Sequence, residues 1–258
     1  MPIDLVVVNY HTPHDLAAFL ASLDRFPPTT CATLTVVDVE TTDTEPATIE
    51  WAAGTARRIA VSDNIGYARA CNLGAQDGTG DIIGLFNADI EATAHAIDFC
   101  TAALVASDDW GALGPCQVDT RNRIRHAGIF GSNAAPVHRG WNEIHRNQYV
   151  DIREAVTISG SAYFIKRRVW DELTACPLYR DIAPDATGAF LPTSHYYEET
   201  YCSYHAREHG HRVMYYGPVT MVHKWHQASP VGGWAELQMP ISREYFRKAC
   251  AHHMMACD

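Results

Sequence analysis

The chain of 258 residues is 47% hydrophobic and 19% charged, with a formal net charge of −10. This composition is typical of a globular protein with one large domain or two small ones, and it excludes disorder over most of the chain. The acidic balance also disfavours nucleic acid as a partner, because nucleic-acid binding depends on neutralising phosphates with Lys and Arg.

Membrane-spanning and secretory signals are missing from the sequence. No run approaches the roughly 18 apolar residues of a transmembrane helix, and the first ten residues lack the basic region and cleavage site of a signal peptide. We therefore expect a cytoplasmic protein. Its eight cysteines are scattered without a CxxC pair, which predicts reduced, mostly buried thiols.

Apolar runs alternate with amphipathic segments in the first half of the chain. Strands are predicted near residues 5–8, 34–37, 58–61, 81–86 and 111–116, and helices near 13–26, 64–80 and 93–106. Strands that alternate with helices predict an α/β fold with a mostly parallel, doubly wound central sheet and helices on both faces. Ligands of such sheets bind beyond the carboxyl ends of the strands.

The second half of the chain has a weaker pattern. Residues 120–150 predict loops and short strands, and residues 156–165 predict a strand that is interrupted at 159–161. Helices are expected at 168–173 and 197–209, with a loop at 176–195 between them. A hairpin-like run is expected at 212–222, around Gly217 and Pro218.

Polar residues follow the predicted strands at the edge where a ligand would bind. Asn9, Asp38, Asn64 and Asp89 each stand at or just beyond a strand end. The chain has neither a GxGxxG loop after the first strand nor a P-loop, so a bound phosphate needs another partner. A divalent cation that bridges diphosphate oxygens would serve, and Asp89 is its best-placed ligand.

Several motifs, in their order along the chain, resemble the inverting nucleotide-sugar glycosyltransferases of the GT-A fold, in the rhamnosyltransferase-like branch of family 2. They are VVVNYHTPHDLAAFLASL near the start, NIGYARACNLGA at 64–75, LFNADI at 85–90, SGSAYFIKRRVWDEL at 159–173 and YYEETYCSYHAREHGHRVMYYGPVTMVHKWH at 196–226. The resemblance implies a single domain of residues 1–258. Within it, residues 1–115 would bind the nucleotide sugar, 116–230 would form the catalytic and acceptor half with a smaller mixed sheet, and 231–258 would form a helical tail.

The resemblance places a uridine or thymidine diphosphate sugar at the strand ends. Asp38 would accept the N3 hydrogen of the base, as a carboxylate can. The other residues expected around the donor are Asn9, Asn64, Gly66, Arg69, Asn72 and Asn87. The alternative is that the 64–75 motif forms only a turn and a capped helix with a solvated arginine.

A metal site is implied where Asn87, Ala88 and Asp89 occupy the DxD position of the family. Asn87 replaces the first acid, so Asp89 would be the main acidic ligand, and His223 would complete the protein's share of an octahedral Mn²⁺ or Mg²⁺ site. Without the resemblance, Asp89 would be read as a turn former and His223 as a surface group.

An acidic pair is implied to carry the chemistry. Glu198 and Glu199 match the family's acids at a helix start, where Glu199 would accept the proton of the acceptor hydroxyl and Glu198 would support it. The reaction would be a single displacement with inversion, onto a glycan, a lipid-linked sugar or a protein. The alternative is that both acids only favour the helix N-terminus, through its dipole.

Other functions remain as alternatives. Asn87 in place of an acid would suit a non-catalytic module that binds nucleotide sugar or carbohydrate. A sugar nucleotidyltransferase is less favoured because NYHTPHD after the first strand is not a glycine-rich basic loop. A zinc hydrolase is disfavoured because His205 and His209, near His211, His223 and His226, do not form HExxH.

A basic aromatic segment lies near the C-terminus, at Arg243, Tyr245, Phe246, Arg247 and Lys248. It could contact a membrane surface peripherally. We favour instead a terminal helix that packs its aromatic side chains inward.

Overall fold

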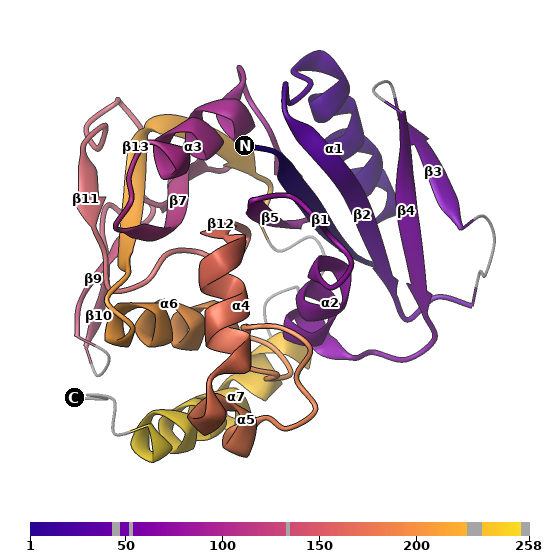
Figure 1. The fold of residues 1–258 in the computed structure, drawn as a ribbon. Helices are drawn as coiled ribbons and strands as arrows, with labels where there is room; N and C mark the ends of the chain where they lie inside the picture. The colour runs from indigo at the N-terminus through magenta and orange to yellow at the C-terminus, as the bar shows by residue number, and fades with distance from the viewer. Residues whose placement is uncertain (43–46, 52–53, 133–134, 226–233, 254–258) are drawn as a thin grey trace.

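The computed structural model describes residues 1–42, 47–51, 54–132, 135–225 and 234–253, which form an α/β fold around one large sheet (Figure 1). The strands are β1 (Ile3–Tyr10), β2 (Cys31–Val39), β3 (Thr48–Trp51), β4 (Gly54–Val61), β5 (Ile82–Asn87), β6 (Ile90–Glu91), β7 (Trp110–Val118), β8 (Ile124–His126), β9 (Ile129–Gly131), β10 (Pro136–His138), β11 (Ile152–Glu154), β12 (Ala162–Lys166) and β13 (Arg212–His223). The helices are α1 (Pro13–Arg25), α2 (Gly66–Ala75), α3 (Ala96–Val105), α4 (Arg167–Ala175), α5 (Pro177–Ile182), α6 (Glu198–Glu208) and α7 (Trp234–His252).

The main sheet is mixed, with a parallel centre. Its order is β11-β13-β7-β12-β5-β1-β2-β4-β3, with β6 beside β13 and β8 beside β7. Strands β5, β1, β2 and β4 run parallel, and β7 runs parallel to β13. Strand β12 is antiparallel to β5 and β7 and joins these two groups. Because β1, β2 and β5 are parallel neighbours, the polar residues that end them meet at one edge.

Helices cover both faces of the sheet because its central strands are apolar on both sides. In β1, Leu5 and Val7 belong to the core cluster under α1 and α3, whereas Val6 and Val8 belong to the cluster under α2, α4 and α6. This two-sided burial is the pattern of a parallel sheet enclosed in a three-layer fold. The predicted fold class is therefore confirmed.

Helix α7 closes a third apolar cluster. Its Phe246 is buried against Tyr197 and Tyr204 of the α6 region, and the Tyr245 hydroxyl donates to the carbonyl of Ile182 at 3.2 Å. The basic residues Arg243, Arg247 and Lys248 are exposed. The aromatic side chains thus pack inward, the arrangement favoured from the sequence.

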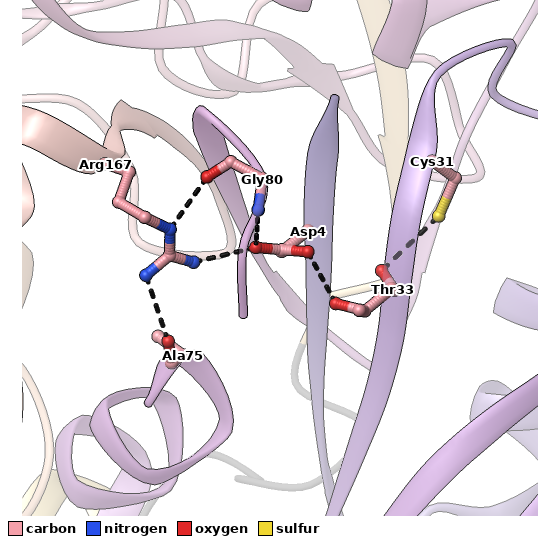
Figure 2. Close-up of polar contacts among 6 residues, drawn as sticks. All are labelled: Asp4, Cys31, Thr33, Ala75, Gly80 and Arg167. Carbon is pink, nitrogen blue, oxygen red and sulfur yellow. Dashed lines mark hydrogen bonds and ion pairs between the residues drawn. The ribbon is translucent and has the colours of Figure 1, made fainter. Parts of the chain in front are cut away.

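A buried ion pair ties the two halves of the chain together at the start of β1 (Figure 2). Oδ2 of Asp4 accepts from the backbone of Gly80 at 2.6 Å and from Arg167 at 2.8 Å, while Oδ1 accepts from Thr33 at 2.6 Å. Arg167 also donates to the carbonyls of Gly80 and Ala75. One carboxylate thereby fixes β1, β2, the turn before β5 and the start of α4.

Three local predictions differ from the structure. Residues 212–223 form one strand rather than a hairpin, because β13 continues past Gly217 and Pro218 with only a register shift against β7. The segment 176–195 contains the short helix α5. Strand β12 begins only at Ala162, after the turn that interrupts the predicted strand.

Two predictions about the whole chain bear on its environment. None of the seven cysteines that the structure describes is in a disulfide, and five of them are buried, as expected for reduced thiols. Over the described ranges, no helix has both the length and the apolar character needed to cross a bilayer.

We expect the Asp4–Arg167 pair to be a major source of stability. Asp4→Asn keeps the shape but leaves the guanidinium without its charge partner, which costs about 3–5 kcal/mol for a buried pair. Urea unfolding should show a loss of this size. The control Arg57→Ala breaks the exposed pair with Asp77 and should cost less than about 1 kcal/mol. A loss as small as the control's for Asp4→Asn would contradict this role.

Candidate active site

The carboxyl ends of β1, β2 and β4 form a connected polar group. The Asn9 amide donates to Oδ1 of Asp38 at 2.8 Å, and Arg58 donates to Oδ2 through Nε at 3.1 Å and through a terminal nitrogen. Asn9 also accepts from the backbone and hydroxyl of Thr12. Asp38 is therefore held by contacts on both oxygens, and because each carboxylate oxygen can accept two hydrogen bonds, Oδ1 keeps one acceptor position that no described residue fills.

A pocket of about 290 Å³ opens at the start of α2, lined by Asn64, Ile65, Gly66, Arg69 and Ser194. Asn64 accepts from the backbone of Gly66 at 3.1 Å. Gly66 has a φ of +78°, and a Cβ there would lie 2.5 Å from the carbonyl oxygen of Ser194. Glycine is thus required at this position. Arg69 is exposed and gives the pocket a positive charge.

Two asparagines of the predicted donor site differ in their position. Asn72 is buried, and its amide donates to the carbonyl and accepts from the N–H of Phe190, at 2.8 and 3.1 Å. Both ends of this amide are engaged, so Asn72 anchors the loop around Phe190. Asn87 is partly exposed at the end of β5.

The two predicted metal ligands lie side by side. Oδ1 of Asp89 is 3.3 Å from Nε2 of His223, and both residues are buried, with 7% and 5% of their surfaces exposed. They meet because β6 pairs antiparallel with the end of β13, with Ile90 opposite His223. The backbone of Lys224 also donates to the carbonyl of Asp89 at 2.9 Å. Two distant parts of the chain thus form one compact oxygen and nitrogen site.

An arginine and two tryptophans border this pair. The Trp225 ring lies 5.3 Å from that of His223 and 5.0 Å from that of Trp141. The Arg125 guanidinium lies 5.5 Å from both tryptophan rings and is paired with Asp119. Trp141 is 41% exposed, so the cluster presents an aromatic surface to solvent, whereas the Arg125 side chain is only 16% exposed.

The two acids begin α6 after an unusual turn. Tyr196 and Tyr197 both have left-handed backbone conformations, with φ of +67° and +71°. Such conformations are costly for bulky residues and cluster at functional sites. The turn aims the two carboxylates differently: Oε2 of Glu198 accepts from Thr193 at 3.1 Å, whereas Oε2 of Glu199 is buried without a hydrogen-bond partner among the described residues.

Burial keeps both acids from ionising easily. It raises the pKa of Glu199 from 4.5 to about 7. Burial and, next, the charge of Glu199 raise the pKa of Glu198 well above its usual value. A carboxylate with a pKa near the working pH can both take up and release a proton, which is the property a general base needs.

Contacts through Gly160 and Ser161 connect Glu199 with the end of β5. The Glu199 side chain lies against Gly160, where a Cβ would be 3.4 Å from it, and the Tyr67 hydroxyl donates to the Gly160 carbonyl at 2.7 Å. The next residue, Ser161, accepts from the backbone of Asn87 at 3.0 Å. Since Asn87 precedes Asp89 by two residues, the acids and the metal ligands belong to the same region of the sheet edge.

The sheet order and this grouping of residues define a GT-A glycosyltransferase. A model described as "Glycosyltransferase like family 2" matches residues 2–245. The chain belongs to that family.

Solved structures share the fold at low identity. GalNAc-T7 with UDP, GalNAc and Mn²⁺ aligns with a TM-score of 0.70 and 14% identity over 97% of this chain and 48% of its own. The mannosyltransferase PcManGT from Pyrobaculum calidifontis, in complex with GDP-Man and Mn²⁺, aligns with a TM-score of 0.56 and 15% identity over 97% of this chain and 73% of its own. S. aureus TarS aligns with a TM-score of 0.54 and 13% identity over 86% of this chain and 36% of its own. The chain spans about half the length of the first of these proteins. No curated protein shows a significant match.

Several residues of this region were not predicted from the sequence. Arg58, Gln117, Arg125, His126 and Trp141 lie in or beside it, but each is set there by strand register or by a long-range contact rather than by a motif. His226, which was weighed with the other histidines, lies outside the described residues.

The buried acids should make the folded protein less stable as pH rises. Glu199 loses its proton near pH 7 when folded but near 4.5 when unfolded, so between these values the folded state holds more protons and the free energy of unfolding falls with pH. Glu199→Gln should make this fall shallower in urea unfolding at a series of pH values. The control Glu208→Gln, at an exposed position of the same helix, should leave the pH dependence of the free energy of unfolding as it is in the wild type. An unchanged pH dependence in Glu199→Gln would contradict the raised pKa of Glu199.

Proposed function

We propose that this glycosyltransferase moves a sugar from a UDP- or dTDP-linked donor to an acceptor hydroxyl, with inversion and with the help of Mn²⁺ or Mg²⁺. The observation that carries the proposal is the buried contact between Asp89 and His223. The pocket at the start of α2 and the rigid Asp38 support a nucleotide beside it. Mn²⁺ accompanies the nucleotide ligands of GalNAc-T7 and PcManGT, which supports a metal-dependent reaction.

The residues at the proposed metal site fit a hard or borderline divalent cation. Asp89 offers a carboxylate oxygen and His223 an imidazole, and Nδ1 of His223 is buried without a hydrogen-bond partner among the described residues. One carboxylate and one imidazole, with phosphate oxygens and water as the further ligands, suit Mn²⁺ or Mg²⁺. When bound, the cation supplies positive charge that stabilises the departing diphosphate.

Glu199 is the proposed general base. Its carboxylate accepts the proton of the acceptor hydroxyl as that oxygen forms a bond to the anomeric carbon and the bond to the nucleoside diphosphate breaks. The attack from the side opposite the leaving group inverts the anomeric carbon. Glu198, whose pKa is also raised by burial, holds the start of α6 through Thr193 and supports the orientation of Glu199.

In this proposal, each residue of the donor site contacts or shapes a different part of the donor. Asp38 accepts the N3 hydrogen of the base, with Asn9 and Arg58 fixing its carboxylate. Asn64 and Gly66 shape the pocket, and Arg69 supplies charge near the diphosphate. Asn87 lines the approach to Asp89.

Replacement of the base should slow the reaction without loss of the nucleotide. Glu199→Gln should reduce kcat about 10²–10⁴-fold, as expected for a lost general base, with nucleotide affinity nearly unchanged. The wild-type rate should rise with pH through about 7, as Glu199 loses its proton, and the variant should lack this rise. The measurement is nucleoside diphosphate release across a panel of donors and acceptors with Mn²⁺. Wild-type turnover in the variant would reject Glu199, and binding without turnover in the wild type would favour the non-catalytic module.

Loss of a metal ligand should uncouple the metal from the nucleotide. In thermal unfolding, wild-type protein should be stabilised more by UDP or dTDP with Mn²⁺ than by either alone, because both ligands bind only the folded state. Asp89→Ala and His223→Ala should each remove the Mn²⁺-dependent part. Glu91→Gln, an acid on the adjoining strand β6, is the matched control. A retained Mn²⁺ effect in both variants would place the metal elsewhere. A larger increase in melting temperature with GDP than with UDP or dTDP would contradict the proposed uracil or thymine specificity.

A further inference from the structure

Helices α5, α6 and α7 come together at the base of the molecule (Figure 1), and three side chains that could together hold a metal ion lie among them. The sulfur of Cys176 and one nitrogen each of His205 and His253 all lie within 4.8 Å of one another. Cys176 stands between α4 and α5, His205 on α6 and His253 just after α7. Three segments that are far apart in the sequence therefore converge on one point.

His205 points to a missing ligand at this place. It is 1% exposed, and neither of its ring nitrogens has a hydrogen-bond partner among the described residues. Buried polar groups in folded proteins are nearly always satisfied, so each exception calls for a partner such as an ion. Burial lowers the pKa of His205 to about 3, which keeps the imidazole neutral and able to coordinate a cation.

The surroundings hold the other ligands in place. The Tyr201 hydroxyl lies 3.0 Å from Nδ1 and 3.1 Å from Nε2 of His253. A hydrogen bond to the backbone of Leu178 partly offsets the lowering of the His253 pKa by burial. Such outer contacts orient the imidazoles of metal sites. The His209 ring lies 4.8 Å from that of His205, and its Nδ1 contacts Glu172.

We propose that Cys176, His205 and His253 form a zinc site that fastens α7 to α6 and to the junction of α4 and α5. One thiolate and two imidazoles are ligands that Zn²⁺ prefers, whereas the carboxylate and imidazole of Asp89 and His223 suit Mn²⁺ or Mg²⁺. Zn–S and Zn–N bonds of about 2.3 and 2.0–2.1 Å require only small side-chain movements from the present spacing. On binding, the thiol releases its proton to solvent, and water fills the fourth position.

The site would act on the catalytic region through α7. Phe246 of α7 stacks on Tyr197 with ring centres 5.2 Å apart, and Ser242 accepts from the backbone of His195 at 3.4 Å. Both contacts lie on the turn that leads into Glu198 and Glu199. Zinc at the far end of α7 would therefore stabilise the helix that supports this turn without contacting the donor.

Cobalt substitution tests the site in the whole protein. Metal-free protein titrated with Co²⁺ should bind one equivalent with a near-ultraviolet band from charge transfer between thiolate and metal, and Zn²⁺ should abolish the band. Asp89→Ala should keep the band, so this outcome does not depend on the proposed function. Absence of a thiolate band at one equivalent of Co²⁺ in the wild type would overturn the site.

Matched variants identify the ligands. Cys176→Ser should lose the band, and both this variant and His253→Gln should bind Zn²⁺ about 100-fold or more weakly, since even outer contacts of metal sites are worth 10- to about 100-fold. The control Cys31→Ser replaces a partly buried thiol outside the site, and the control His252→Gln replaces the exposed imidazole next to His253. Both controls should bind Zn²⁺ as the wild type does. Zn²⁺ should raise the melting temperature of the wild type and not of Cys176→Ser. A band that persists in Cys176→Ser would show that another thiol is the ligand.

Discussion

The pairing of β6 with the end of β13 is the constraint on which the proposed chemistry depends. It brings a carboxylate that follows β5 against an imidazole from the second half of the chain, in a position where both are buried. Two ionisable groups placed so far from water are costly unless they are paired or bind a cation. The strand topology therefore places a buried carboxylate and imidazole side by side, which is the pair of groups that the proposed metal site requires.

A second constraint acts on the acids of α6. Two consecutive left-handed residues and the contact of Glu199 with Gly160 remove its carboxylate from water without giving Oε2 a partner. This burial raises the pKa of Glu199 to about 7, so the same packing that destabilises the ionised folded state prepares the group to accept a proton. If Glu199 is the general base, as proposed, stability and reactivity are opposed at this position, as is common at sites that perform chemistry.

The sequence allowed the positions of several polar strand-end residues to be predicted, because periodic apolar runs identify strands and parallel strands place their last residues at one edge. Asn9, Asp38 and Asp89 follow this rule directly. Arg58 could not be found in this way, since its partner Asp38 is set by the register between β2 and β4. Likewise, Gly217 and Pro218 signal a turn locally, but pairing with β7 on both sides of them keeps β13 continuous. Trp141 meets Trp225 only through long-range packing, and periodicity carries no such information.

The central claim is that one divalent cation is held between the two halves of the chain. Crystals grown with Mn²⁺ and UDP or dTDP, measured at a wavelength where manganese scatters anomalously, test it most directly. The account predicts an anomalous peak within bonding distance of the Asp89 carboxylate, the His223 imidazole and the diphosphate. A nucleotide bound with the manganese peak remote from both side chains would contradict it.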